Sequence, residues 1–227
     1  MSAPPVPRLH LPLVPDETLR PTLAAAPRIA LSDVGGGPAA GPPSRVAFAA
    51  STRTLVVLFE VEAEPPLRVA APDGGTVYED ECVEVFVADP GDPAFYREVV
   101  VSPAGARYGA EVRNPDESRE TWTLRPGRLP AGLEVEVSGD PADRLPSDWH
   151  RWRCRIELPW RSLSTSGIPP SPGSERRLNA FRIARGRTTR YHALSPTLRT
   201  SPPDFHVPSR FARLLFAGPP AFARPAC

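Results

Sequence analysis

Residues that form disulfides or bind metals are scarce in this chain. Its 227 residues include three cysteines, one methionine and four histidines. Cys82, Cys154 and Cys227 lie far apart, so they match neither a disulfide framework nor a zinc-binding pattern. Cys82 and Cys154 fall within strand-like runs, which favours buried free thiols. A haem site built on methionine and histidine has few ligands to draw on.

An excess of charge and a long apolar run are also lacking. The 27 basic and 26 acidic residues leave a net charge of +1, which gives no electrostatic case for nucleic-acid or membrane partners. No apolar run approaches the roughly 20 residues of a membrane span. Prolines interrupt the opening segment, MSAPPVPRLHLPLVPD, so we expect no signal peptide and a cytoplasmic location.

Proline, by contrast, is abundant. The chain has 32 prolines, where average usage would give roughly 11. Genome composition bias accounts for part of this excess, because the chain is also rich in arginine and alanine. Proline disfavours helix interiors and central strands, so the excess predicts many loops between short strands. With 41% hydrophobic residues the chain can still build a core.

Short strand-like runs recur at fairly regular intervals along the chain, and they predict an all-β fold. We expect one antiparallel β-sandwich, jelly-roll-like, with about ten strands and minimal helix. We expect residues 1–27 to form a proline-rich extended arm, 28–217 a single domain and 218–227 a proline-rich tail. Residues 45–49 and 54–61 are expected to form a hairpin. Residues 82–87, 95–102 and 106–112 predict a meander, and residues 160–163 predict one helical turn.

The strand at residues 82–87 is the most informative segment. One of its faces carries only valine, and the other carries a cysteine, an acid and an aromatic ring: Val83, Val85 and Val87 against Cys82, Glu84 and Phe86. A half-apolar face with one acid is not an ordinary solvated face. It is either a second buried layer or the floor of a cleft. Acids nearby could hold calcium, but a solvated acidic rim is favoured for Glu79, Asp80, Glu81, Asp89 and Asp92.

Three segments together resemble a known family. They are YEDECVEVFVADP at 78–90 followed by SPAGARY at 102–108, RIELPWRSL at 155–163 followed by LNAFRIARG at 178–186, and YHALSPTLRTSPPDFHVPSRFARLLF at 191–216. Their order and spacing resemble the family 9 carbohydrate-binding modules, within the wider DOMON-like group. The resemblance implies a non-catalytic sandwich that holds a mono- or oligosaccharide between two aromatic rings, with no cofactor beyond a structural calcium.

The resemblance also implies site residues. Tyr78 matches one clamp aromatic, Glu84 the sugar-binding acid and Arg107, more loosely, an arginine of a following strand. The second clamp, a tryptophan, is absent here, and Tyr191 or His192 is the candidate substitute. These types suit a pyranose, since aromatic rings cover its C–H face while carboxylate and guanidinium groups bond its hydroxyls.

Four tryptophans and His206 are further aromatic candidates for the core or the site. Trp149, Trp152 and Trp160 are expected in the core, whereas Trp122 is the better candidate for exposure. A catalytic role for His206 is disfavoured, because no serine or cysteine elbow accompanies it. We expect Phe205 to anchor that loop.

Non-catalytic carbohydrate binding, with a role in carbohydrate catabolism, is the leading hypothesis. Three alternatives remain open. They are a glycan-active hydrolase using Glu84 and Glu98, a haem or redox domain, and an interaction scaffold that has lost sugar binding. The sequence does not define an oligomeric state.

Overall fold

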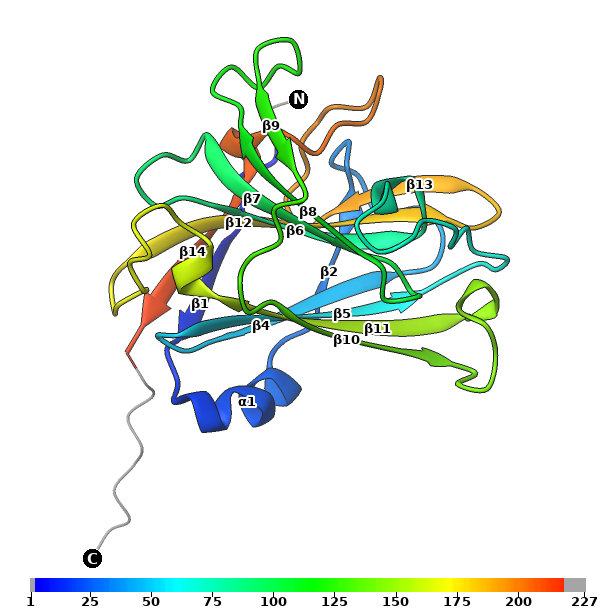
Figure 1. Ribbon diagram of the computed structural model, residues 1–227, viewed down its shortest axis with the longest axis horizontal. Coiled ribbons are helices and arrows are strands. Elements are labelled where there is room, and N and C mark those ends of the chain that lie inside the picture. Colours follow the sequence, from blue (N-terminus) through cyan, green and yellow to red (C-terminus); the bar gives the residue numbers. More distant parts are fainter. Residues whose placement is uncertain (1–2, 219–227) are drawn as a thin grey trace, which may run out of the picture.

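The protein is described by a computed structural model over residues 3–218, and it consists of two packed β-sheets (Figure 1). A five-stranded sheet has the order β10 (Glu134–Asp140), β11 (Arg151–Pro159), β5 (Thr54–Glu62), β4 (Ser44–Ala50) and β2 (Ile29–Ala30). A nine-stranded sheet has the order β1 (Arg8–Pro12), β14 (Ala212–Ala217), β12 (Glu175–Arg185), β6 (Cys82–Ala88), β7 (Phe95–Val101), β8 (Arg107–Arg113) and β9 (Thr123–Pro126), with β13 (Thr189–Ala193) on β12 and β3 (Ser32–Asp33) on β13.

The sandwich core confirms the alternation expected for the central strand. Val83, Val85 and Val87 of β6 face the space between the sheets, where they meet the inner face of β5. The β4–β5 hairpin and the β6–β7–β8 meander also pair as predicted. The predicted helical turn is the 3₁₀ segment Trp160–Ser162. Trp149, Trp152 and Trp160 are buried, as expected for core residues.

The other face of the nine-stranded sheet is also buried over much of its area. Cys82 and Phe86 of β6 belong to a second apolar cluster, which loop residues before β14 cover. Phe205 anchors this loop by stacking on Phe181, with ring centroids 4.2 Å apart. The Asn179 amide bonds both the backbone N–H and the backbone carbonyl of Ser195. The loop therefore forms a fixed layer over one side of the sheet.

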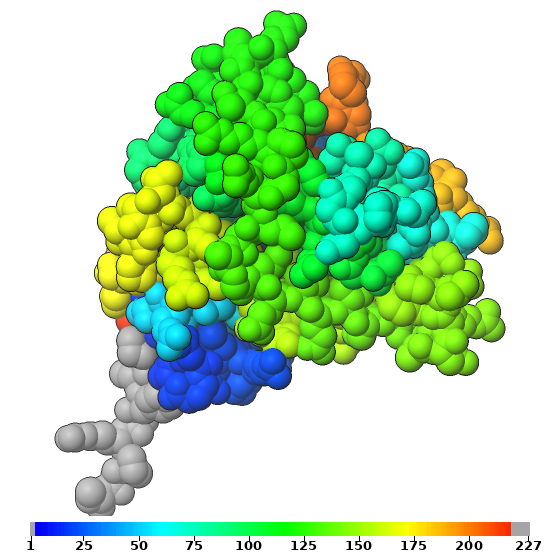
Figure 2. Space-filling view, in the orientation of Figure 1, coloured from blue at the N-terminus to red at the C-terminus, as the bar shows by residue number. Residues whose placement is uncertain are grey.

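The N-terminal segment differs from the expected extended arm. Strand β1 pairs in parallel with β14, and helix α1 (Leu19–Ala25) packs on the outer face of the five-stranded sheet, at the bottom of Figures 1 and 2. The proline excess obscured two short apolar patterns. Leu11 in β1 and Leu13 just after it are two residues apart and both buried, while Leu19 and Leu23 lie four residues apart on one helix face. Of the expected C-terminal tail, residues 219–227 lie outside the described part.

Two of the acids before β6, Asp80 and Glu81, also differ from the expected solvated rim, whereas Glu79 is exposed as expected. Asp80 is 1% exposed and accepts hydrogen bonds from the backbone of Ala70 and Ala71 as well as from Arg68. Glu81 is fully buried and forms an ion pair with Arg182, at 2.8 Å. Buried carboxylates must be paired, so these acids organise the entrance to β6 rather than contact solvent. Across the described residues, no helix has the length and apolar character needed to cross a membrane.

The packing of the N-terminal segment can be tested by truncating Leu13, the residue that follows β1. Leu13 is 5% exposed and packs into the core between the sheets. We expect Leu13→Ala to lower the free energy of unfolding by about 2–5 kcal/mol, measured by urea denaturation. The matched control is His10→Ala, because His10 is exposed on the same segment. Equal effects of the two substitutions would contradict the packing of this segment against the sandwich.

Candidate functional site

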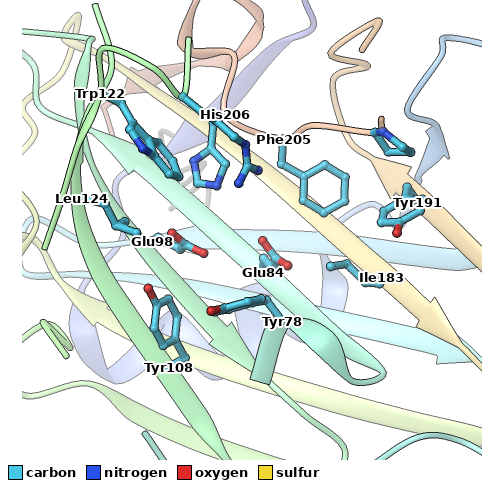
Figure 3. A pocket seen from close by; sticks show the side chains of 12 residues that line it. Tyr78, Glu84, Glu98, Tyr108, Trp122, Leu124, Ile183, Tyr191, Phe205 and His206 are labelled. Atoms are coloured by element: carbon cyan, nitrogen blue, oxygen red, sulfur yellow. The ribbon is translucent and has the colours of Figure 1, made fainter. Parts of the chain in front are cut away.

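A pocket of about 230 Å³ opens on the outer face of the nine-stranded sheet (Figure 3). Its floor comes from β6, β7 and β12, and its walls come from the 3₁₀ turn Val77–Glu79, from β8 and from two loops. The lining residues are mainly aromatic and acidic: Tyr78, Glu84, Glu98, Tyr108, Arg119, Trp122, Leu124, Ile183, Tyr191, Pro203, Phe205 and His206.

Two glutamates form the polar floor. Glu84 lies opposite Val100, and Glu98 lies opposite Phe86, so the two acids are diagonal neighbours on adjacent strands. The Cα atoms of such neighbours are roughly 7–8 Å apart. Glu84 is 2% exposed and Glu98 is 4% exposed. Burial raises the pKa of both carboxyl groups, that of Glu98 to about 8, and the charge of Glu98 further raises the pKa of Glu84.

Aromatic rings flank these acids on two sides. Tyr78 and Tyr108 pack edge to face, with ring centroids 5.1 Å apart, and 37% of Tyr78 is exposed. Figure 3 shows the two glutamates between these tyrosines and a second group formed by Trp122 and His206. Trp122 and His206 are also in edge-to-face contact at 4.8 Å. The pocket therefore has aromatic surfaces on opposite sides of a carboxyl floor.

One wall is fixed by a hydrogen-bonded network. Arg119 donates two hydrogen bonds to the Asp204 carboxylate, at 3.1 and 2.8 Å, and its guanidinium lies 5.0 Å from the Trp122 ring centroid. Burial would raise the pKa of Asp204, but hydrogen bonds from Arg119 and from the His206 backbone outweigh it and lower that pKa. The His206 ring bonds the Tyr96 hydroxyl at 2.8 Å, and burial lowers its pKa to about 3. His206 is therefore neutral at physiological pH.

The structure brings together three of the five residues that the sequence singled out. Tyr78, Glu84 and Tyr191 line the pocket. Arg107 does not, because strand alternation sends Tyr108 to the pocket and Arg107 to the other face, where it pairs with Asp73 at 2.7 Å. His192 does not either: Tyr191 faces the pocket, whereas His192 is buried on the opposite side of β13.

His192 lies across the β12–β13 pair from Arg182. Burial, followed by the positive charge of Arg182, lowers the pKa of His192 to about 4. His192 is therefore a neutral, buried residue that packs beside Arg182, and it does not contact the pocket.

Sequence reasoning missed several lining residues. Tyr108 shares a face with Ala110 and Val112, so strand alternation could have identified it. Trp122, expected to be exposed, provides the second aromatic wall, but its loop carries no periodic signal. Arg119 and His206 come from separate loops, and only the fold brings them together. In the described part of the chain, no group of three or more histidine, cysteine or acidic side chains is placed to hold a metal ion.

Comparisons with known proteins agree with this architecture. The model of carbohydrate-binding family 9 matches residues 39–216, and the chain belongs to this family. None of the curated protein sequences matches the chain.

Solved structures share the fold at low sequence identity. A Bacteroides uniformis protein assigned a carbohydrate-binding role is 18% identical and superposes with a TM-score of 0.70, covering 93% of this chain and all of that one. A family 9 module from Caldicellulosiruptor kristjanssonii, solved with cellotriose, is 14% identical with a TM-score of 0.61, covering 97% and 98% of the two chains. The corresponding glucose complex gives 14% identity and a TM-score of 0.60, covering 96% and 100%.

Proposed function

We propose that this protein binds a carbohydrate without transforming it, in the pocket above Glu84 and Glu98. The observation that carries the proposal is the placement of Tyr78 and Trp122 on opposite sides of a carboxyl floor. Membership of a carbohydrate-binding family supports it, as do related structures that hold cellotriose and glucose. A role in carbohydrate catabolism is a further expectation of the same proposal.

The dimensions and chemistry of the pocket suit a sugar ring. Pockets for drug-sized ligands have volumes of roughly 300–1,000 Å³, so a pocket of about 230 Å³ suits a smaller ligand such as one pyranose. The aromatic rings can cover the C–H face of the sugar, while the carboxyl oxygens accept hydrogen bonds from its hydroxyls. The tyrosine hydroxyls can serve as donors or acceptors.

Glycoside hydrolysis is a weaker interpretation of the same acids. The structure does bring Glu84 and Glu98 into one pocket. A hydrolase needs one ionised carboxylate beside one protonated acid, with environments that separate their pKa values. Here burial raises the pKa of both groups, that of Glu98 to about 8, so both carboxyl groups are mainly protonated at neutral pH and the ionised partner is missing. This common environment supports a binding role.

The proposal is tested by calorimetric titration with glucose and cellotriose. We expect binding by the wild type, and at least about tenfold weaker binding by Tyr78→Ala and by Trp122→Ala, because each loses a ring of the clamp. The matched control is Phe95→Ala, since Phe95 is a half-buried aromatic on β7 outside the pocket. It should bind as the wild type does. No heat of binding with either sugar, or release of reducing sugar from a polysaccharide, would contradict the proposal.

A further inference from the structure

Within the described part of the chain, the two floor acids form no ion pair. Among residues 3–218, Glu98 has no hydrogen-bond or ion-pair partner, although it is 4% exposed and faces the pocket. Glu84 receives one weak contact, from the Cys82 thiol at 3.7 Å. Buried carboxyl groups normally have full hydrogen-bond partners. The missing partners point to a ligand that supplies donors at this depth.

The charged side chains around the floor donate no hydrogen bond to Glu84 or Glu98 in the described part of the chain. Arg119 is the one cationic side chain among the described residues that line the pocket, and both of its bonded guanidinium nitrogens donate to Asp204. Burial raises the pKa of both floor acids and outweighs the opposing positive charge of Arg119. The neighbouring His206 is neutral because burial lowers its pKa to about 3. When Glu98 ionises, the pocket therefore gains a negative charge that no described side chain pairs with directly. The described residues offer no third acid, histidine or cysteine that would complete a metal site here.

The walls of the pocket contain aromatic side chains, which can bind an organic cation. Aromatic faces attract ammonium groups through the ring quadrupole, by about 0.5–2 kcal/mol depending on desolvation. Tyr78 and Tyr108 flank the acids on one side of the pocket (Figure 3), whereas the Trp122 ring on the other side already carries the Arg119 guanidinium. A neutral sugar would use these rings only as apolar surfaces. A ligand with an ammonium group would use the rings and both carboxyl groups together.

We propose that the preferred ligand is an amino sugar, whose ammonium group lies between Glu84 and Glu98 while its ring contacts the aromatic walls. This inference rests on the proposed carbohydrate-binding function and narrows its ligand class. The ammonium group supplies the hydrogen-bond donors that the floor lacks. Glucose is nearly isosteric but carries a hydroxyl in place of the ammonium group, and the N-acetylated sugar lacks the charge and is bulkier at that position.

Binding should be coupled to proton release. Without ligand, burial keeps the Glu98 carboxyl protonated at neutral pH, because its pKa is about 8. An adjacent ammonium group stabilises the carboxylate form and lowers that pKa. A proton therefore passes from the floor to solvent when the ammonium enters, and the net charge of the pocket is conserved. A neutral sugar would release no proton.

The test compares three sugars by calorimetric titration at about pH 6.5, below the pKa of the Glu98 carboxyl: D-glucosamine, D-glucose and N-acetyl-D-glucosamine. We expect the wild type to bind glucosamine at least about tenfold more tightly than either neutral sugar. Glu98→Gln, which keeps the shape of the side chain, should lose this preference. Glu111→Gln is the matched control, because Glu111 lies on the adjacent strand, pairs with Arg97 and is not part of the pocket. It should retain the preference.

A second measurement depends on no variant. Titrating the wild type with glucosamine in two buffers of different ionisation enthalpy counts the protons released, and we expect a net release that glucose does not produce. Equal affinity for glucose and glucosamine, or no proton release, would overturn the amino-sugar inference and leave sugar binding in place. Failure of all three sugars to bind would overturn the proposed function as well.

Discussion

Replacing Arg182 by methionine is expected to lower the free energy of unfolding by about 3–5 kcal/mol. The Arg182 guanidinium is 2% exposed and pairs with Glu81 at 2.8 Å. It also donates to the Ser44 hydroxyl at 2.9 Å and to the Glu62 carbonyl at 2.8 Å, both on the five-stranded sheet. Methionine would leave the Glu81 carboxylate buried without its cation and would remove the hydrogen bonds that join the two sheets.

Urea denaturation of Arg182→Met measures this loss. The control is Arg190→Met, since Arg190 pairs with Glu64 at a similar distance, 2.9 Å, but with side chains 23% and 35% exposed. Partly exposed pairs contribute about 0–1 kcal/mol, so the control should remain close to the wild type. Similar losses in both variants would show that burial of the Arg182 pair has no special effect.

Raising the pH from about 5 to about 8.5 is expected to destabilise the protein through Glu98. Its pKa is about 8 in the folded chain, because of burial, and 4.5 is its ordinary value. Well below pH 4.5 the Glu98 carboxyl is protonated in both the folded and the unfolded chain, so its contribution to folding stability is fully present. Between these values the unfolded chain releases a proton that the folded chain keeps, so stability falls as pH rises. The loss is on the order of 3–5 kcal/mol.

The Glu98→Gln substitution isolates this effect from other titrating groups, because glutamine resembles the protonated acid. We expect the variant to match the wild type near pH 5 and to be several kcal/mol more stable at about pH 8.5, measured by urea denaturation at each pH. Glu111→Gln should show no such gain. If the wild type were as stable as the Glu98→Gln variant at the higher pH, burial would not raise the pKa of Glu98 as described.

Much of the fold could be predicted because its strands obey a simple period. Alternation alone placed Val83 and Glu84 on opposite faces, and the β4–β5 hairpin followed from two apolar runs around a short turn. The N-terminal strand and helix were missed for a different reason. Their few leucines become significant only once the edge strand β14 and the outer face of the five-stranded sheet are present to receive them.

The site was predictable only as far as single strands determine it. Glu84 was identified from its own strand, and Tyr78 was identified from the family resemblance. Arg107 and His192 were each one position away from a lining residue, and in a strand one position changes the face. Trp122 lies in a loop, whose path depends on contacts such as the hydrogen bond from the Asn114 amide to the His206 carbonyl, at 2.9 Å. Local sequence does not determine such contacts.

Strand β6 serves both the inter-sheet core and the pocket, and this double role has an evolutionary consequence. Each of its residues belongs either to the inter-sheet core or to the face that bears the pocket, with no position in this described strand free of both. Inserting a single codon within the strand would turn Val83 and Val85 toward the ligand and bury Glu84 among apolar side chains. Ligand preference in this lineage should therefore diversify through the loops around Trp122 and Phe205, while the length of β6 stays constant.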